Sequence, residues 1–110
     1  LGRISVAAEE NFTGSTAKTG IRFEVTPAGS VTPSEKMRLN GSGQLLLGTT
    51  TPTGGASVAM EISSTTGALL LPRMTTTERN SLTAANGMMI YNTTTGKIQG
   101  YQSGAWADMA

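Results

Sequence analysis

The sequence predicts an all-β, elongated chain that completes its hydrophobic core only by associating with further chains. Leu, Ile, Val and Phe supply 20 of the 110 residues, about 18%, which is little apolar bulk for a self-sufficient globule of this length. The net charge of +1 is too small for the self-repulsion that is typical of disordered chains. Glycines and threonines recur as turn signals about every ten residues, a spacing that favours short strands.

The first half of the chain contains three segments that predict strands. Residues 21–25 alternate between apolar and polar side chains, which is the pattern of a half-buried strand. Residues 37–39 alternate again and run into a Gly-rich turn at 40–43. The three leucines at 45–47 are apolar on both faces, so such a strand must be covered on both sides, which one small sheet cannot do.

A Thr- and Gly-rich stretch at 49–55 is the best internal boundary, and it divides the chain into a shaft-like β region, 1–54, and a C-terminal tip module, 55–110. Residues 58–62 alternate once more. A second run of three leucines, 69–71, is stopped by Pro72, which favours extended geometry in the residue before it.

The tip module is predicted to contain one short helix followed by a β-meander. Thr75 with Glu78 three residues later forms a capping-box pattern, so we expect a helix of about two turns over 76–82. Three apolar segments, 88–92, 98–102 and 106–109, alternate with turn signals at 94–97 and 103–104. These segments predict a three-stranded meander.

Several of these segments resemble parts of bacteriophage tail fibres. Residues 37–52, which end in GTTTP, are similar to a fibre segment in which a strand and a Gly turn lead to such an exit. The stretches LLLPRMTTTER (69–79) and GMMIYNTTTGK (87–97), followed by residues 104–106, resemble a C-terminal tip module of phage fibres and related fibrous proteins. Residues 8–11 and 21–23 resemble the fibre region upstream of such segments.

The resemblance implies the C-terminal receptor-binding region of a tail fibre, an extracellular part of the virion. Such a region would be an intertwined, fibre- or prism-like homotrimer whose two leucine runs line the three-fold axis. Its partners would be two further copies of itself and a host bacterial surface polysaccharide or outer-membrane protein. Many such fibres continue into a self-cleaving chaperone domain, which we expect to be absent here or removed.

Composition excludes several other classes of protein. With eight basic and seven acidic residues, the chain lacks the excess of positive charge that is typical of nucleic-acid-binding proteins. No apolar run reaches the roughly 18–20 residues that span a bilayer, so no membrane insertion is expected. The absence of His and Cys removes the commonest general base, the thiol nucleophile and most zinc sites, so we expect no enzyme, no metal and no cofactor.

Glycoside hydrolysis is the enzymatic alternative that stays open, because it needs only two carboxylates roughly 5–10 Å apart. Adjacent Glu9 and Glu10 would point to opposite faces of a strand, which does not suit such a pair. Glu78 is explained as the cap partner. Carboxylates of neighbouring subunits could still meet, so a capsule depolymerase is retained as an alternative.

Binding is the better-supported hypothesis. Aromatic rings with polar edges suit stacking on sugars, and amide side chains supply hydrogen bonds. The candidate receptor-binding residues are Tyr91, Gln99, Tyr101, Gln102 and Trp106, with Asn92 and Asp108 as further hydrogen-bonding groups. Each aromatic residue has a competing interpretation as part of the core. A structural shaft or trimerisation module without receptor binding, and a bacterial surface adhesin with a similar tip, are the remaining alternatives.

Overall fold

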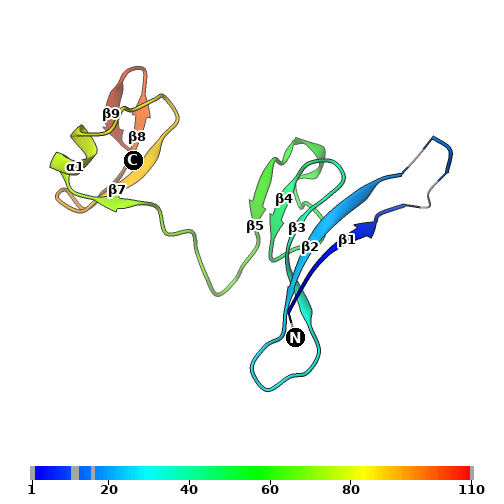
Figure 1. Cartoon of the computed structure of the whole chain (residues 1–110). Helices are drawn as coiled ribbons and strands as arrows, with labels where there is room; N and C mark the ends of the chain where they lie inside the picture. Colours follow the sequence, from blue (N-terminus) through cyan, green and yellow to red (C-terminus); the bar gives the residue numbers. More distant parts are fainter. Residues whose placement is uncertain (1, 11–12, 16, 110) are drawn as a thin grey trace. The chain divides into compact units, whose positions relative to one another are not determined.

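The computed structural model describes residues 2–10, 13–15 and 17–109, so residue 11 of the fibre resemblance lies outside it. The chain forms two compact units, Leu1–Ala68 and Leu69–Ala110, each built on one β-sheet (Figure 1). The predicted all-β fold with one short α-helix is confirmed. The predicted boundary after residue 54 lies within the first of the two units.

The first unit is a five-stranded sheet whose strands follow one another in chain order. Its strands are β1 (Arg3–Ala8), β2 (Thr19–Val25), β3 (Ser34–Leu39), β4 (Leu45–Leu47) and β5 (Met60–Ile62). The first four are antiparallel neighbours, whereas β4 and β5 run parallel and are joined by a crossover. Strand β1 was not predicted, and β3 begins three residues before its predicted start.

The strand register gathers the apolar side chains of this unit on one side of the sheet. Ile4 pairs with Phe23, Val6 with Ile21, and the series continues across the remaining strands. We use the name N-terminal apolar face for Ile4, Val6, Ile21, Phe23, Met37, Leu39, Leu45, Leu47, Met60 and Ile62. Ile4 and Val6 are each 72% exposed and Met60 is 58% exposed, so the unit itself leaves much of this face open.

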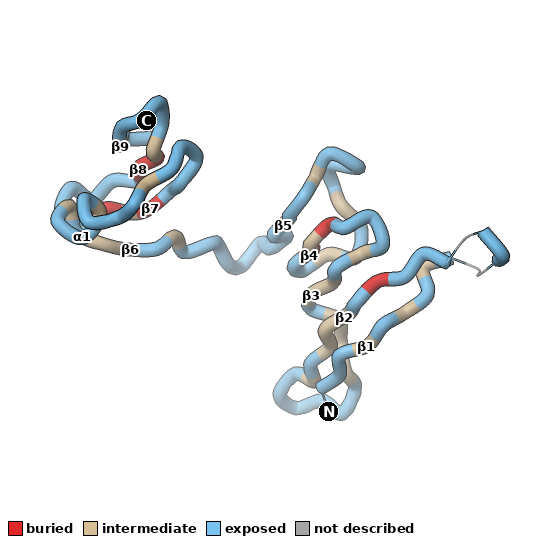
Figure 2. Tube along the Cα trace, turned by 45° about the horizontal axis from the view of Figure 1, so that its top comes forward, coloured by how far each residue is buried: buried red, intermediate tan, exposed pale blue. Residues whose placement is uncertain are grey.

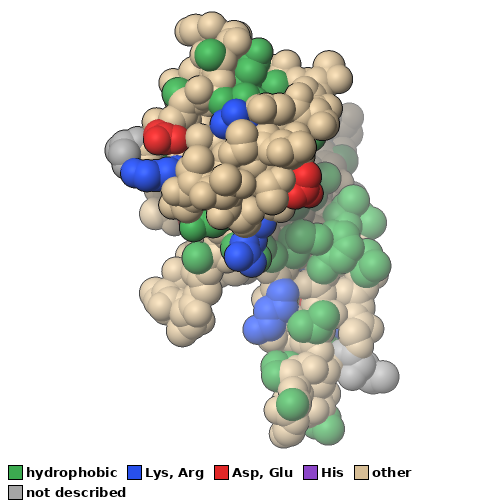
Figure 3. All heavy atoms as spheres, turned by 90° about the vertical axis from the view of Figure 1, so that its left-hand side faces the viewer, with side chains coloured by type: hydrophobic (Ala, Val, Ile, Leu, Met, Phe, Trp, Pro, Cys, Tyr) green, Lys and Arg blue, Asp and Glu red, His purple; other side chains and the backbone are tan. Residues whose placement is uncertain are grey.

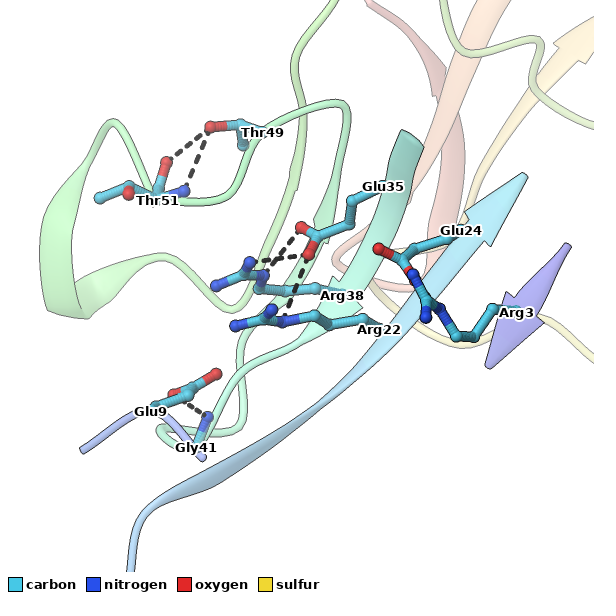
Figure 4. Close-up of polar contacts among 9 residues, drawn as sticks. All are labelled: Arg3, Glu9, Arg22, Glu24, Glu35, Arg38, Gly41, Thr49 and Thr51. Atoms are coloured by element: carbon cyan, nitrogen blue, oxygen red, sulfur yellow. Dashed lines mark hydrogen bonds and ion pairs between the residues drawn. The ribbon is translucent and has the colours of Figure 1, made fainter. Parts of the chain in front are cut away.

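The opposite side of the same sheet is polar and carries ion pairs (Figure 4). Arg38 donates two hydrogen bonds to Glu35, at 2.7 and 2.9 Å, and Arg22 Nε lies 3.4 Å from a Glu35 oxygen. The hydrogen bond to Glu35 raises the pKa of Arg38 above its ordinary value. Arg3 pairs with Glu24 across β1 and β2. This side of the sheet therefore finds charged partners within its own chain.

The crossover between β4 and β5, which includes the 3₁₀ turn Gly55–Ser57, is held on the polar side. Gln44 donates to the carbonyl oxygens of Gly55 (2.9 Å) and Val58 (2.7 Å), and Glu61 accepts two hydrogen bonds from Thr53. Leu46 points to this side and is completely enclosed, one of the few buried positions in Figure 2. The predicted need for cover on both sides of the first leucine run is thus met on one side only.

The second unit is a four-stranded sheet with one helix. Its elements are β6 (Arg73–Met74), α1 (Thr76–Asn80), β7 (Met89–Asn92), β8 (Lys97–Gln102) and β9 (Ala105–Asp108). Strands β7 to β9 form the predicted antiparallel meander, and β6 adds a parallel edge to β7. Ser103 and Gly104 both have positive φ, 51° and 82°, which is the geometry of a two-residue hairpin turn.

The capping box at the start of α1 is confirmed. The Glu78 amide donates to the Thr75 hydroxyl at 3.2 Å, and the Thr75 amide donates to the Glu78 carboxylate at 3.2 Å. The helix ends at Asn80 rather than at the predicted residue 82. The amides of Ser81 and Leu82 bond to carbonyls three residues back, so the last turn tightens and the α-helix stops.

Replacing Leu46 tests where the core of the first unit lies. Leu46→Ala should lower the free energy of unfolding by about 2–5 kcal/mol, because it empties an enclosed site. Val31→Ala is the control, since Val31 is 91% exposed, and it should cost less than about 0.5 kcal/mol. Urea unfolding at one fixed chain concentration measures both; equal effects would contradict the assignment.

The capping box predicts a pH dependence. Hydrogen bonds from Thr75 lower the pKa of Glu78, so the carboxylate stabilises the folded chain at pH values above its ordinary pKa. That contribution is lost as the pH falls through the folded-state pKa. Thr75→Val should therefore raise the pKa of Glu78 in an NMR titration, whereas Thr95→Val should not. An unchanged Glu78 pKa in Thr75→Val would contradict this.

Candidate functional site

The C-terminal sheet sorts the predicted binding residues onto two faces. The register places Gln99 opposite Ile90 and Asp108, and Tyr101 opposite Trp106. The side chains of these residues lie on the face that carries α1, because Arg79 of the helix contacts both Gln99 and Trp106. We refer to this side as the helix face.

Two buried amide side chains hold the helix face together. Asn92 is completely enclosed and Gln99 is 6% exposed. The Asn92 amide nitrogen donates to Thr76 Oγ1 and to Gln99 Oε1, both at 3.0 Å. Gln99 donates in turn to Asp108 at 2.8 Å and accepts from Arg79 at 2.8 Å. This network connects α1, β7, β8 and β9.

The aromatic residues of the helix face lie beside this network. The rings of Tyr101 and Trp106 are 5.3 Å apart and meet edge-to-face at 72°. The Arg79 guanidinium lies 5.7 Å from the centre of the Trp106 ring, a cation–π distance. Both aromatic side chains are half-buried, so part of each ring remains accessible.

The other side of the sheet is apolar and more open. Tyr91 and Ile98 lie opposite each other there, and Arg73 pairs with Tyr91 from the edge strand. Together with the second leucine run they line an open cleft of about 330 Å³. Leu69 is 64% and Leu70 76% exposed. We name this side the C-terminal apolar face; its exposed large apolar side chains are Leu69, Leu70, Met89, Ile98 and Met109.

The structure therefore does not bring the five predicted residues to one site. Gln99, Tyr101 and Trp106 lie on the helix face, while the alternation of strands places Tyr91 and Gln102 on the C-terminal apolar face. The buried Gln99 side chain makes its hydrogen bonds to Arg79, Asn92 and Asp108. Contact of the five predicted residues with a receptor stays a prediction.

Arg79, the cation next to Trp106, was not predicted from the sequence. The capping box at Thr75 was available as a signal, because it fixes the start of the short helix and so the position of Arg79 in its last turn. A local sequence pattern does not show on which face of the sheet the helix packs. The packing face decides which aromatic residue Arg79 contacts.

The described part of the chain contains no group of three or more Asp, Glu, His or Cys side chains placed to hold a metal ion. Among the same residues, no helix has the length and apolar character to cross a membrane.

One family of proteins is recognised in this chain. The model of the phage tail like trimerisation region matches residues 46–110, which is more than half of the chain and includes β4 except for Leu45, all of β5 and the whole C-terminal unit. No curated protein matches the chain, and neither does any solved structure.

A structural role for Gln99 can be separated from a direct binding role. Gln99→Ala should lower the free energy of unfolding by about 1–3 kcal/mol, because it leaves buried partners unpaired. Gln102→Ala, at an exposed position of the same strand, should cost less than about 0.5 kcal/mol. Thermal and urea unfolding compare the two variants. A Gln99→Ala chain as stable as the unaltered chain would contradict the structural role.

Proposed function

The chain belongs to the family of the phage tail like trimerisation region, and from this premise we propose that it is the distal, homotrimeric segment of a phage tail fibre that binds a host surface polysaccharide during adsorption. In this proposal the chain is an extracellular part of the virion and has no catalytic role.

The observation that carries the proposal is the chemical difference between the two faces of the C-terminal sheet. The C-terminal apolar face exposes leucine, methionine and isoleucine side chains that suit contact with further copies of the chain. The helix face instead offers aromatic rings beside charged and amide groups. A face of the second kind can remain in water in a trimer, so it is the one available to a ligand.

The helix face has the composition that sugar recognition needs. The accessible parts of Trp106 and Tyr101 offer apolar surface for the C–H side of a sugar ring. Arg79 and Asp108 supply a donor and an acceptor beside these rings. Gln99, which is buried against Asn92, bonds to both residues and so holds α1 and β9 in place. Of the five predicted residues, Tyr101 and Trp106 are therefore the ones we propose as receptor contacts.

A second candidate function is a structural trimerisation segment without receptor binding. The burial of Gln99 and the position of Tyr91 in an apolar cleft favour it, since both then serve packing rather than recognition.

Binding of the full chain to an array of purified bacterial surface polysaccharides, and to the corresponding cells by flow cytometry, distinguishes the two. We expect binding to at least one polysaccharide, and Trp106→Ala should weaken it at least about tenfold, a loss of about 1.4 kcal/mol. Thr95→Ala, in the exposed β7–β8 turn, is the matched control and should bind normally.

Both variants must keep the mass and melting temperature of the unaltered chain for the comparison to count. A trimeric chain that binds no polysaccharide and no cell would overturn the receptor role and leave the structural one. Release of reducing ends from the polysaccharide would instead identify a depolymerase.

A further inference from the structure

We propose that the N-terminal apolar face is a second self-association surface, covered by two further copies of this chain. The trimer interface would then extend beyond the matched residues 46–110 to β1, β2 and β3. This inference rests on the trimeric part of the proposed function and not on receptor binding.

The N-terminal apolar face is continuous with the matched trimerisation region. Leu47, Met60 and Ile62 belong to the matched trimerisation region, and all three lie on the N-terminal apolar face. The register continues this face without interruption from β4 to Leu39 of β3, Ile21 of β2 and Val6 of β1. Strands β1, β2 and β3 share this face with β4 and β5. A partner chain that covers the apolar side of β4 and β5 can therefore extend over these three strands as well.

The two sides of the N-terminal sheet differ in chemistry and in cover. The polar side is covered by the crossover and carries the Arg38–Glu35 pair, whereas the apolar side is open. Figure 3 shows hydrophobic side chains gathered on the surface of the molecule. Monomeric soluble proteins rarely leave contiguous apolar patches larger than a few hundred Å² in water.

The charges around the N-terminal apolar face also permit contact between identical copies. None of the ten side chains of the N-terminal apolar face is ionisable. Lys36 lines a pocket with Leu47 and Ile62 and is exposed, so one cation borders this face where its charge can stay in water. Identical copies can therefore meet across the ten apolar side chains without burying like charges against each other. A second copy of the chain has the same exposed apolar face, so contact between the two copies buries both faces. A further copy of the chain is therefore the partner that we propose for this surface.

Single introduced cysteines test the inference, because the chain has no cysteine of its own. Val6→Cys places a thiol on the N-terminal apolar face. Ser5→Cys, its neighbour on β1, places one on the opposite side of the sheet and serves as the matched control. Leu47→Cys places a thiol on the same apolar face within the matched region. Each purified full chain is treated with a short bismaleimide, and covalent dimers are measured on a denaturing gel.

We expect Val6→Cys and Leu47→Cys to form covalent dimers at least about tenfold faster than Ser5→Cys. If a trimer forms in which Leu47→Cys cross-links but Val6→Cys does so no faster than Ser5→Cys, the interface ends at the matched region and this inference fails, while trimeric assembly stands. If neither cross-links and each variant has the mass of a single chain, the trimeric part of the proposed function fails as well.

Discussion

Each of the two sheets has one apolar face that its own unit leaves open, and the other features of the structure depend on this constraint. The first unit uses its crossover to cover the polar side of the sheet, where Leu46 is enclosed, and the second unit uses α1 for the face that contains Asn92 and Gln99. Among the residues that the structure describes, neither unit has a further layer for its apolar side. Since burial of apolar surface is the main favourable term in folding, stability then depends on association.

On the covered face of each sheet, hydrogen-bonded polar side chains rather than large apolar side chains hold the covering segment in place. Gln44 anchors the crossover in the first unit, and Asn92 with Gln99 joins the helix to three strands in the second. Buried amides of this kind are directional, so they fix one arrangement of neighbouring elements. In a chain with so few large apolar residues, these networks define the shape of each unit, while the apolar faces remain free for partner chains. Recognition by the helix face, as we propose it, uses this rigid support.

Local patterns in the sequence predicted most elements but not their partners. Alternation identified β2 and the meander, and the Thr75–Glu78 capping box located the start of α1. Strand β1 was overlooked because Ile4 and Val6 alternate over only a few residues. The helix end was misplaced because the last turn tightens after Asn80. Alternation places Gln99 and Gln102 on opposite faces, but only the packing of α1 decides which face is covered, so the burial of Gln99 was not predictable.

The most direct test of the account is the mass of the unaltered chain in solution, measured by light scattering after size exclusion over a wide range of concentrations. The account predicts a species of about 34 kDa, three times the 11.3 kDa chain, that persists on dilution until the chain unfolds. Folded structure and association should disappear together. A well-folded, stable monomer of 11.3 kDa would contradict the claim that the two open apolar faces need partner copies.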